Sequence, residues 1–126
     1  MGKILRKQIV SETGDVICND SMILSIITLS TKEINGIASM DNSFASKLKD
    51  KVCKNHFEGA SFKYISNDYN EIVVDVYVNV FANYNVSEIS YKVQQNIMTA
   101  VQNMAGIKVK KVNVHVVGVE FVAEEN

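Results

Sequence analysis

The chain of 126 residues contains no proline, no tryptophan and only two cysteines. A sequence so poor in cysteine has no disulfide framework, and we expect Cys18 and Cys53 to be free thiols. Without proline, the turns must be formed by glycine and asparagine. The sequence also lacks a linker rich in serine and glycine, an internal repeat and a low-complexity tract. Together with its length, these absences predict a single domain over residues 1–126.

Neither a strong net charge nor a long apolar run is present. Thirteen Lys and Arg against fourteen Asp and Glu give a formal net charge of −1, so the chain has no general attraction to nucleic acid or acidic membranes. The longest apolar stretch, residues 22–29, is far below the roughly 18 residues of a membrane-spanning helix. The opening residues do not have the pattern of a secretory signal, and we expect a cytoplasmic protein.

The N-terminal half has the apolar spacing of one clear helix and of a second, shorter one. The first follows Asn19 and Asp20, either of which can cap it, and ends at Asn35-Gly36. Its apolar stripe consists of Ile23, Ile26, Ile27, Ser30 and Ile34, with Leu24 at the border. The shorter helix is expected within residues 41–58, on the apolar residues Phe44, Leu48 and Val52.

A long helix is predicted from Asn85, with Glu88 placed as in a capping box, to Gly106. Its expected apolar stripe consists of Val86, Ile89, Val93, Ile97, Ala100, Val101 and Met104. Its polar side carries Gln94, Gln95, Gln102 and Asn103, with Lys92 as the clear charge. Because uncharged amides lose their water more easily than charged groups, this side is a candidate for protein contact, and simple exposure is the alternative.

Strict alternation of apolar and other residues predicts a strand over residues 72–80, with Ile and Val at every even position. Further strands are expected at 15–18, 61–65 and 112–117, the last followed by a bulge at Gly118. The order β-α-β-β-α-β predicts an α+β fold of two layers. Its two main helices would cover one face of a sheet of three or four strands, and the last strand would return parallel to the 72–80 strand.

The outward face of the 72–80 strand carries Asp75, Tyr77 and Asn79, and the last strand carries Asn113 and His115. Gathered on an open sheet face, these residues could form a polar site. The favoured interpretation is a solvated side of a half-buried sheet, because open sheets commonly have one.

The same outward face also carries apolar and aromatic residues, namely Val73, Tyr77 and Phe81. Patches of this kind often mark interfaces. The last strand is rich in valine, and at a sheet edge its unpaired backbone groups could template another strand near Val117. We therefore expect the protein to act by contact, either with itself as a homo-oligomer or with another protein.

Metal and nucleophile chemistry have weak support in the sequence. Cys53 and His56 have the spacing of half a zinc site, but the other soft ligands, Cys18 and His115, belong to distant elements. A Cys–His nucleophile, with Cys53 or Cys18 beside His115, lacks a third member. We expect no catalytic residue, no cofactor and no metal ligand, and hence no enzyme and no small-molecule substrate.

Binding of RNA is a minor alternative. Small βαββαβ domains often bind RNA through aromatic residues on an open sheet, and Tyr64, Tyr77 and Phe81 are the rings available here. The sequence lacks the aromatic-rich strand motif and the G-x-x-G loop of the common RNA-binding domains. A group of lysines within residues 47–54 is interrupted by Asp50 and is typical of the wet side of a short helix.

Five segments, in this order, resemble the alkaline-shock (general envelope-stress) protein family of Gram-positive bacteria. They are Ile34-Asn35-Gly36-Ile37-Ala38-Ser39-Met40, Glu58-Gly59-Ala60-Ser61-Phe62, the strand 72–80, the helical stretch from Val93-Gln94 to Asn103-Met104-Ala105-Gly106-Ile107, and Val112-Asn113-Val114-His115-Val116-Val117-Gly118-Val119-Glu120-Phe121. The resemblance covers about residues 14–121. The family's Tyr-Gly before the long helix is Tyr84-Asn85 here.

The resemblance implies a non-enzymatic scaffold or adaptor tied to envelope stress or homeostasis, without catalytic residues to carry over. It also implies a partner, which is either a protein that anchors the chain at the inner face of the cell membrane or a regulatory protein. The alternative is a regulator of fatty-acid or lipid metabolism.

Purified protein should carry no stoichiometric zinc, because four soft ligands are not expected to meet. Elemental analysis of the full chain checks this, and a chelator should leave the melting temperature unchanged. One zinc ion per chain would contradict the expectation.

Overall fold

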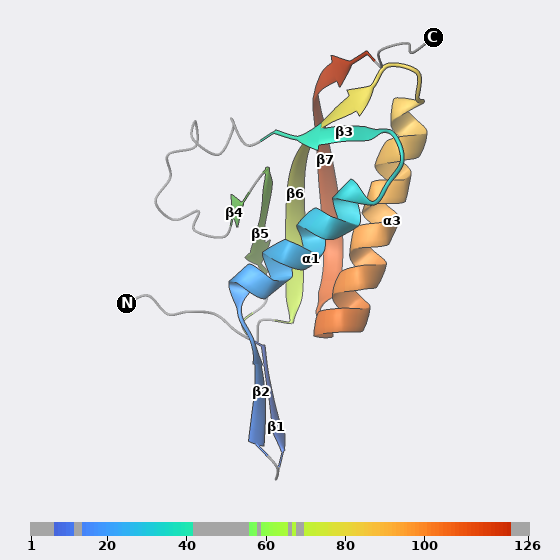
Figure 1. The fold of residues 1–126 in the computed structure, drawn as a ribbon. Helices are drawn as coiled ribbons and strands as arrows, with labels where there is room; N and C mark the ends of the chain where they lie inside the picture. The colour runs from blue at the N-terminus through green and yellow to red at the C-terminus, as the bar shows by residue number, and fades with distance from the viewer. Residues whose placement is uncertain are drawn as a thin grey trace.

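The computed structural model describes residues 7–11, 14–41, 56–57, 59–65, 67 and 70–121. Their elements, in order, are β1 (Lys7–Ser11), β2 (Gly14–Cys18), α1 (Asp20–Lys32), β3 (Ile37–Met40), β4 (His56–Phe57), β5 (Ala60–Tyr64), β6 (Glu71–Phe81), α3 (Val86–Ala105) and β7 (Lys108–Glu120). Figure 1 shows α1 and α3 on one face of the main sheet. The predicted α+β architecture of two layers is confirmed.

Strand β6 lies at the centre of the main sheet. The long strand β7 pairs with it in parallel along one edge, so the predicted parallel return after the long helix is confirmed. Two strands share the other edge, both antiparallel: β5 lies beside Ile72–Val76, and β3 lies beside Val78–Val80. Strand β4 pairs with β5 on its far side. Every strand of this sheet is therefore placed by β6 or by a neighbour of β6.

The predicted first strand is present as β2, but it does not join the main sheet. It pairs antiparallel with β1 in a separate two-stranded sheet, which projects away from the rest of the molecule in Figure 1. The place beside the C-terminal half of β6 is taken by β3, which was not predicted. Strand β3 has four residues, all half-buried, so the alternation that reveals a strand is missing from its sequence.

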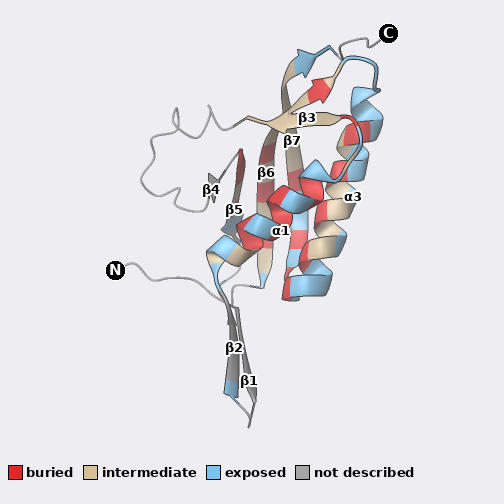
Figure 2. Ribbon diagram, in the orientation of Figure 1, coloured by how far each residue is buried: buried red, intermediate tan, exposed pale blue. Residues whose placement is uncertain are grey.

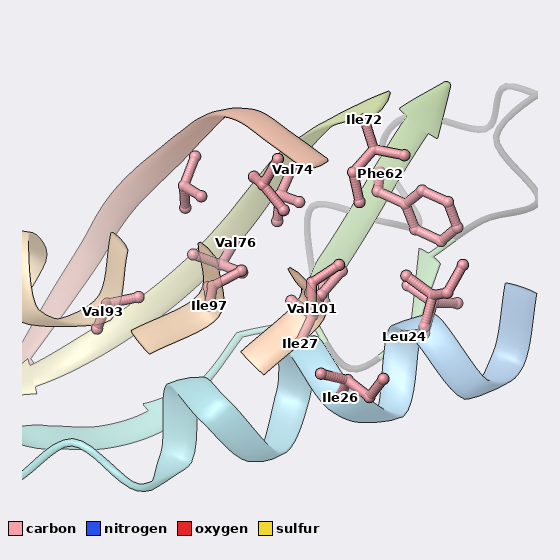
Figure 3. Close-up of a cluster of buried hydrophobic side chains, with 14 of the residues drawn as sticks. Leu24, Ile26, Ile27, Phe62, Ile72, Val74, Val76, Val93, Ile97 and Val101 are labelled. Atoms are coloured by element: carbon pink, nitrogen blue, oxygen red, sulfur yellow. The ribbon is translucent and has the colours of Figure 1, made fainter. Parts of the chain in front are cut away.

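The core lies between the helices and the inward face of β6. Ile72, Val74, Val76, Val78 and Val80 are each at most 1% exposed. Figure 2 shows the buried residues gathered between the two layers, and Figure 3 shows α1 and α3 contributing Ile27, Ile97 and Val101 to the same cluster. Burial in this face is the main source of stability, at about 1.5–3 kcal/mol for each fully buried side chain.

Both helices begin as the sequence predicts and α3 also ends as predicted, whereas α1 ends at Lys32, before the predicted end at Asn35-Gly36. The side chain of Asn19 accepts a hydrogen bond from the Met22 backbone, and Asn85 accepts one from Glu88. Gly106 ends α3 with φ of 68°, in the left-handed region where glycine is favoured. The predicted short helix within residues 41–58 lies outside the described residues, except for Asp41 and the two residues of β4.

The predicted stripe of α3 is correct in its middle and wrong at both ends. Val86 is 42% exposed and Met104 is 64% exposed. The buried residues follow a strict spacing of four and are Ile89, Val93, Ile97, Val101 and Ala105. Because this spacing starts at Ile89 and finishes at Ala105, the stripe passes beside Val86 and Met104 rather than through them.

Helix α1 buries more of its circumference than predicted, including two threonines. Thr31 donates from its hydroxyl to the Ile27 carbonyl at 2.9 Å. Thr28 is 5% exposed, and within the described part of the chain its hydroxyl has no hydrogen-bond partner. An unpaired buried hydroxyl costs free energy, because it loses water and gains nothing in exchange.

Replacing Thr28 with valine keeps the shape of the side chain and removes the unpaired hydroxyl. We expect Thr28→Val to raise the free energy of unfolding by about 1 kcal/mol, measured by urea denaturation. Thr31→Val is the matched control, since it removes a bonded hydroxyl and should be neutral or destabilising. A loss of stability in Thr28→Val would show that this hydroxyl has a partner.

Candidate interaction face

The face of the main sheet that points away from the helices is called the open face here. It carries the alternate residues of β6, all half-buried: Glu71, Val73, Asp75, Tyr77, Asn79 and Phe81. Directly paired residues of neighbouring strands share a face. The register therefore adds Ser61 and Lys63 of β5, Ser39 of β3, and Lys111, Asn113, His115, Gly118 and Glu120 of β7.

Asp75 is the centre of a first polar cluster on the open face. Its Oδ1 accepts a hydrogen bond from Asn113 Nδ2 at 3.0 Å and lies 3.0 Å from His115 Nε2. The His115 ring stacks on Tyr77, with centroids 4.3 Å apart and planes 11° from parallel. The structure thus brings together four of the polar residues that the sequence placed on this face.

Asn79, the fifth predicted polar residue, belongs to a second cluster. Its Nδ2 donates to Ser39 Oγ at 3.0 Å, and Ser39 Oγ donates to Glu120 Oε2 at 3.2 Å. Ser39 and Glu120 were not predicted as members of a site. Ser39 was missed because β3 was missed, whereas the alternation of the last strand, continued past its bulge, could have placed Glu120.

Gly118 makes room for the second cluster. Its predicted bulge is confirmed, because the register between β6 and β7 shifts beside it and leaves Val117 outside the ladder. A Cβ at Gly118 would lie 2.4 Å from Asn79 Oδ1. The absence of a side chain there therefore leaves room for the Asn79 amide, whose oxygen lies against β7 while its nitrogen donates to Ser39 on β3.

The chemistry available to the Asp75–His115 pair is limited. The side chains are 30% and 41% exposed respectively, so both are open to solvent. Among the described residues, no group of three or more His, Cys, Asp or Glu could hold a metal ion. Cys53 and the side chains of Cys18 and His56 lie outside the described residues. The structure therefore tests neither the hypothesis of a zinc site nor that of a Cys–His nucleophile.

The stacked rings also bear on RNA binding. Tyr77 and His115 stand on neighbouring strands with their faces together, so they present their edges outward. A base needs a free aromatic face to stack on. Tyr64, another of the three rings considered for RNA binding, lies on the helix side, where its hydroxyl is 3.3 Å from Asp20 Oδ1 and its ring meets Phe62 edge to face. Phe81, the third ring, is half-buried at the end of β6.

The remaining predicted contact residues are distributed over two surfaces. Phe81 and Val117 are half-buried near the C-terminal ends of β6 and β7. The glutamines of α3 have different surroundings. Gln94 Nε2 donates to the Val112 carbonyl at 3.0 Å and so ties the helix to β7, whereas Gln95 and Gln102 are exposed.

The space left by Gly118 can be tested by a pair of substitutions. We expect Gly118→Ala to lower the free energy of unfolding by about 1–2 kcal/mol, because its methyl group displaces the Asn79 amide. In an Asn79→Ala background the same substitution should cost less than half as much, since the clash is gone. Urea denaturation of the four proteins measures both values, and equal costs in the two backgrounds would contradict the proposed contact.

Comparison with known proteins identifies relatives of this chain. Protein YqhY of Bacillus subtilis is 28% identical over 109 residues, which are 86% of this chain and 78% of that protein. Protein Spy1535 of Streptococcus pyogenes serotype M6 is 25% identical over 106 residues, which are 84% of this chain and 79% of that protein. Solved structures titled MamM CTD are similar with a TM-score of 0.47 at 12% identity, and cover 79% of this chain and 95% of theirs.

The described helices include none long and apolar enough to cross a membrane. The sequence profile of the alkaline shock protein 23 family, described by its cell envelope-related function, matches residues 8–121. That range includes β6, both helices and the whole open face. Nearly the entire chain is therefore accounted for, and the protein belongs to the alkaline shock protein 23 family.

Proposed function

We propose that this protein is a non-enzymatic scaffold or adaptor of cell-envelope stress or homeostasis, which acts by protein contact. Its partners are other copies of itself and a membrane-anchoring or regulatory protein. It works in the cytoplasm, where such a partner recruits it to the inner face of the cell membrane. The open face and strand β7 are the contact surfaces.

The observation that carries this proposal is the mixed character of the open face. The described helices lie on the opposite side of the sheet in Figure 1, so they do not cover this face. It combines Val73, Phe81 and the Tyr77–His115 ring pair with hydrogen-bonded polar groups. Aromatic residues beside satisfied polar groups are typical of protein interfaces, because rings bury area at low cost in side-chain entropy.

The polar clusters support contact rather than catalysis. Asp75 holds Asn113 and His115, and Ser39 joins Asn79 to Glu120, so these side chains satisfy one another. A general base needs a nucleophile within reach, and the recorded contacts of His115 among the described residues are the Asp75 carboxylate and the Tyr77 ring. The contacts among the described residues therefore favour a preorganised contact surface.

Affinity capture from lysate tests the proposal with one variant on each side of the sheet. The full chain should retain a defined set of proteins, and Tyr77→Lys should retain roughly tenfold less, because a lysine replaces the stacked ring. Leu29→Lys is the matched control, because Leu29 is 64% exposed on α1, on the other side of the molecule. It should retain as much as the wild type.

The identity of the captured material separates the candidate functions. A membrane-anchored protein supports the scaffold. Enzymes of acyl-lipid metabolism would favour the regulatory function, and ribosomal RNA would favour a nucleic-acid-binding module. Equal capture by wild type and Tyr77→Lys would show that the open face is not the contact surface.

A further inference from the structure

Strand β7 forms an outer edge of the main sheet over its whole length. Among the described strands it pairs with β6 alone. It runs from Lys108 to Glu120 and contains no proline, so its other side presents backbone groups that a further strand could pair with. A valine-rich edge of this length needs either protection or a partner.

The first residues of this edge, up to Lys110, are protected. Lys110 is the extra residue of a bulge, because Val109 pairs with Ile72 and Lys111 already pairs with Val73. Bulges and lysines are among the usual means of blocking an edge. The carbonyl of Val112 accepts one hydrogen bond, from Gln94, and its second lone pair remains for a neighbouring strand.

The C-terminal part lacks this protection. Val109 and Val112 are buried, whereas Val119 is 54% exposed. Val117 stands outside the ladder with β6, so its backbone groups are extra to that pairing. The exposed apolar surface and the available backbone groups therefore coincide between Asn113 and Glu120.

Charge along this strand is self-complementary. Lys108, Lys110 and Lys111 lie at one end and Glu120 at the other, with no Asp, Glu, Lys or Arg between Lys111 and Glu120. A second β7 in parallel would bring lysine to lysine. A second β7 running antiparallel brings Lys111 opposite Glu120 twice, and both residues lie on the open face.

On these grounds we propose that two copies of this chain pair their β7 strands antiparallel, about a two-fold axis at His115, to form one continuous sheet. The inference rests on the proposed function, since it names a second copy as one partner of a contact protein. It also assigns the β7 edge, rather than the open face, as the surface between copies.

The register follows from which face each residue occupies. With Lys111 opposite Glu120 of the second copy and Val117 outside the ladder in both, every pair joins residues of the same face. On the helix side Val112 meets Val119 and Val114 meets Val116, which extends the core across the axis. On the open face Asn113 meets Gly118, and His115 meets His115 of the partner subunit.

Charge reversal tests this pairing on the full chain by sedimentation analysis. Lys111→Glu alone should weaken the dimer roughly tenfold, because it sets two carboxylate pairs at the interface, and Glu120→Lys should do the same with two ammonium pairs. Mixed in equal amounts, the two variants should associate to within about threefold of wild type, since each opposes the other with the complementary charge. Lys92→Glu, on α3, is the control with the same change of charge and should leave the dimer unchanged.

A cysteine at the axis gives an independent readout. In a background with Cys18→Ser and Cys53→Ser, His115→Cys should form an intermolecular disulfide on mild oxidation, because the two Cα atoms of a directly opposed pair are about 4.5–5.5 Å apart. Asn113→Cys should not, since it faces Gly118 of the second copy.

A strictly monomeric wild type at high concentration overturns the inference and leaves the capture result untouched. A dimer in which the mixture is no stronger than either variant places the interface elsewhere, as does cross-linking at Asn113→Cys. Conversely, loss of all captured partners with an intact, charge-dependent dimer would reject the adaptor function and retain the β7 pairing.

Discussion

The physical constraint on which the rest of the structure depends is the complete burial of one face of β6. Its even-numbered residues are at most 1% exposed, while both of its edges are occupied by hydrogen-bonded strands. A strand in this position cannot shift by one residue, because a shift would exchange its valines for Asp75, Tyr77 and Asn79 in the core. The helices are held against it by the same valines, and the open face follows as the necessary reverse side.

The secondary structure of a segment that buries one face and exposes the other can be predicted from its own sequence. The alternation of residues 72–80 and the cap residues Asn85 and Gly106 were sufficient to predict β6 and α3. The fold class followed from their order. Residues whose role depends on a distant neighbour were not predictable: β3 is recognised only by its pairing with β6, and β2 could not be assigned to a second sheet without knowing that β1 precedes it.

The open face likewise has features that local sequence predicts and features that depend on distant residues. Its β6 residues and His115 could be placed from alternation, but their hydrogen bonds join three strands that are far apart in the sequence. Asn79 bonds to a residue forty positions away, and Ser39 to one eighty-one positions away. The glutamines of α3 illustrate the reverse, because adjacent residues of one type have different roles. Gln94 reaches a carbonyl of β7, while Gln95, one position on, faces solvent.

The two bulges of β7 act as phase corrections. The valines that face the helices are Val109, Val112, Val114, Val116 and Val119, and the spacing between them is three residues at each bulge and two elsewhere. Without the bulge at Val117, strict alternation would invert the chain beyond it, with Gly118 in the helix layer and Glu120 directed toward apolar surroundings. By absorbing one residue, each bulge returns every later side chain to its proper face, so a strand with two breaks in its alternation still keeps one continuous apolar side.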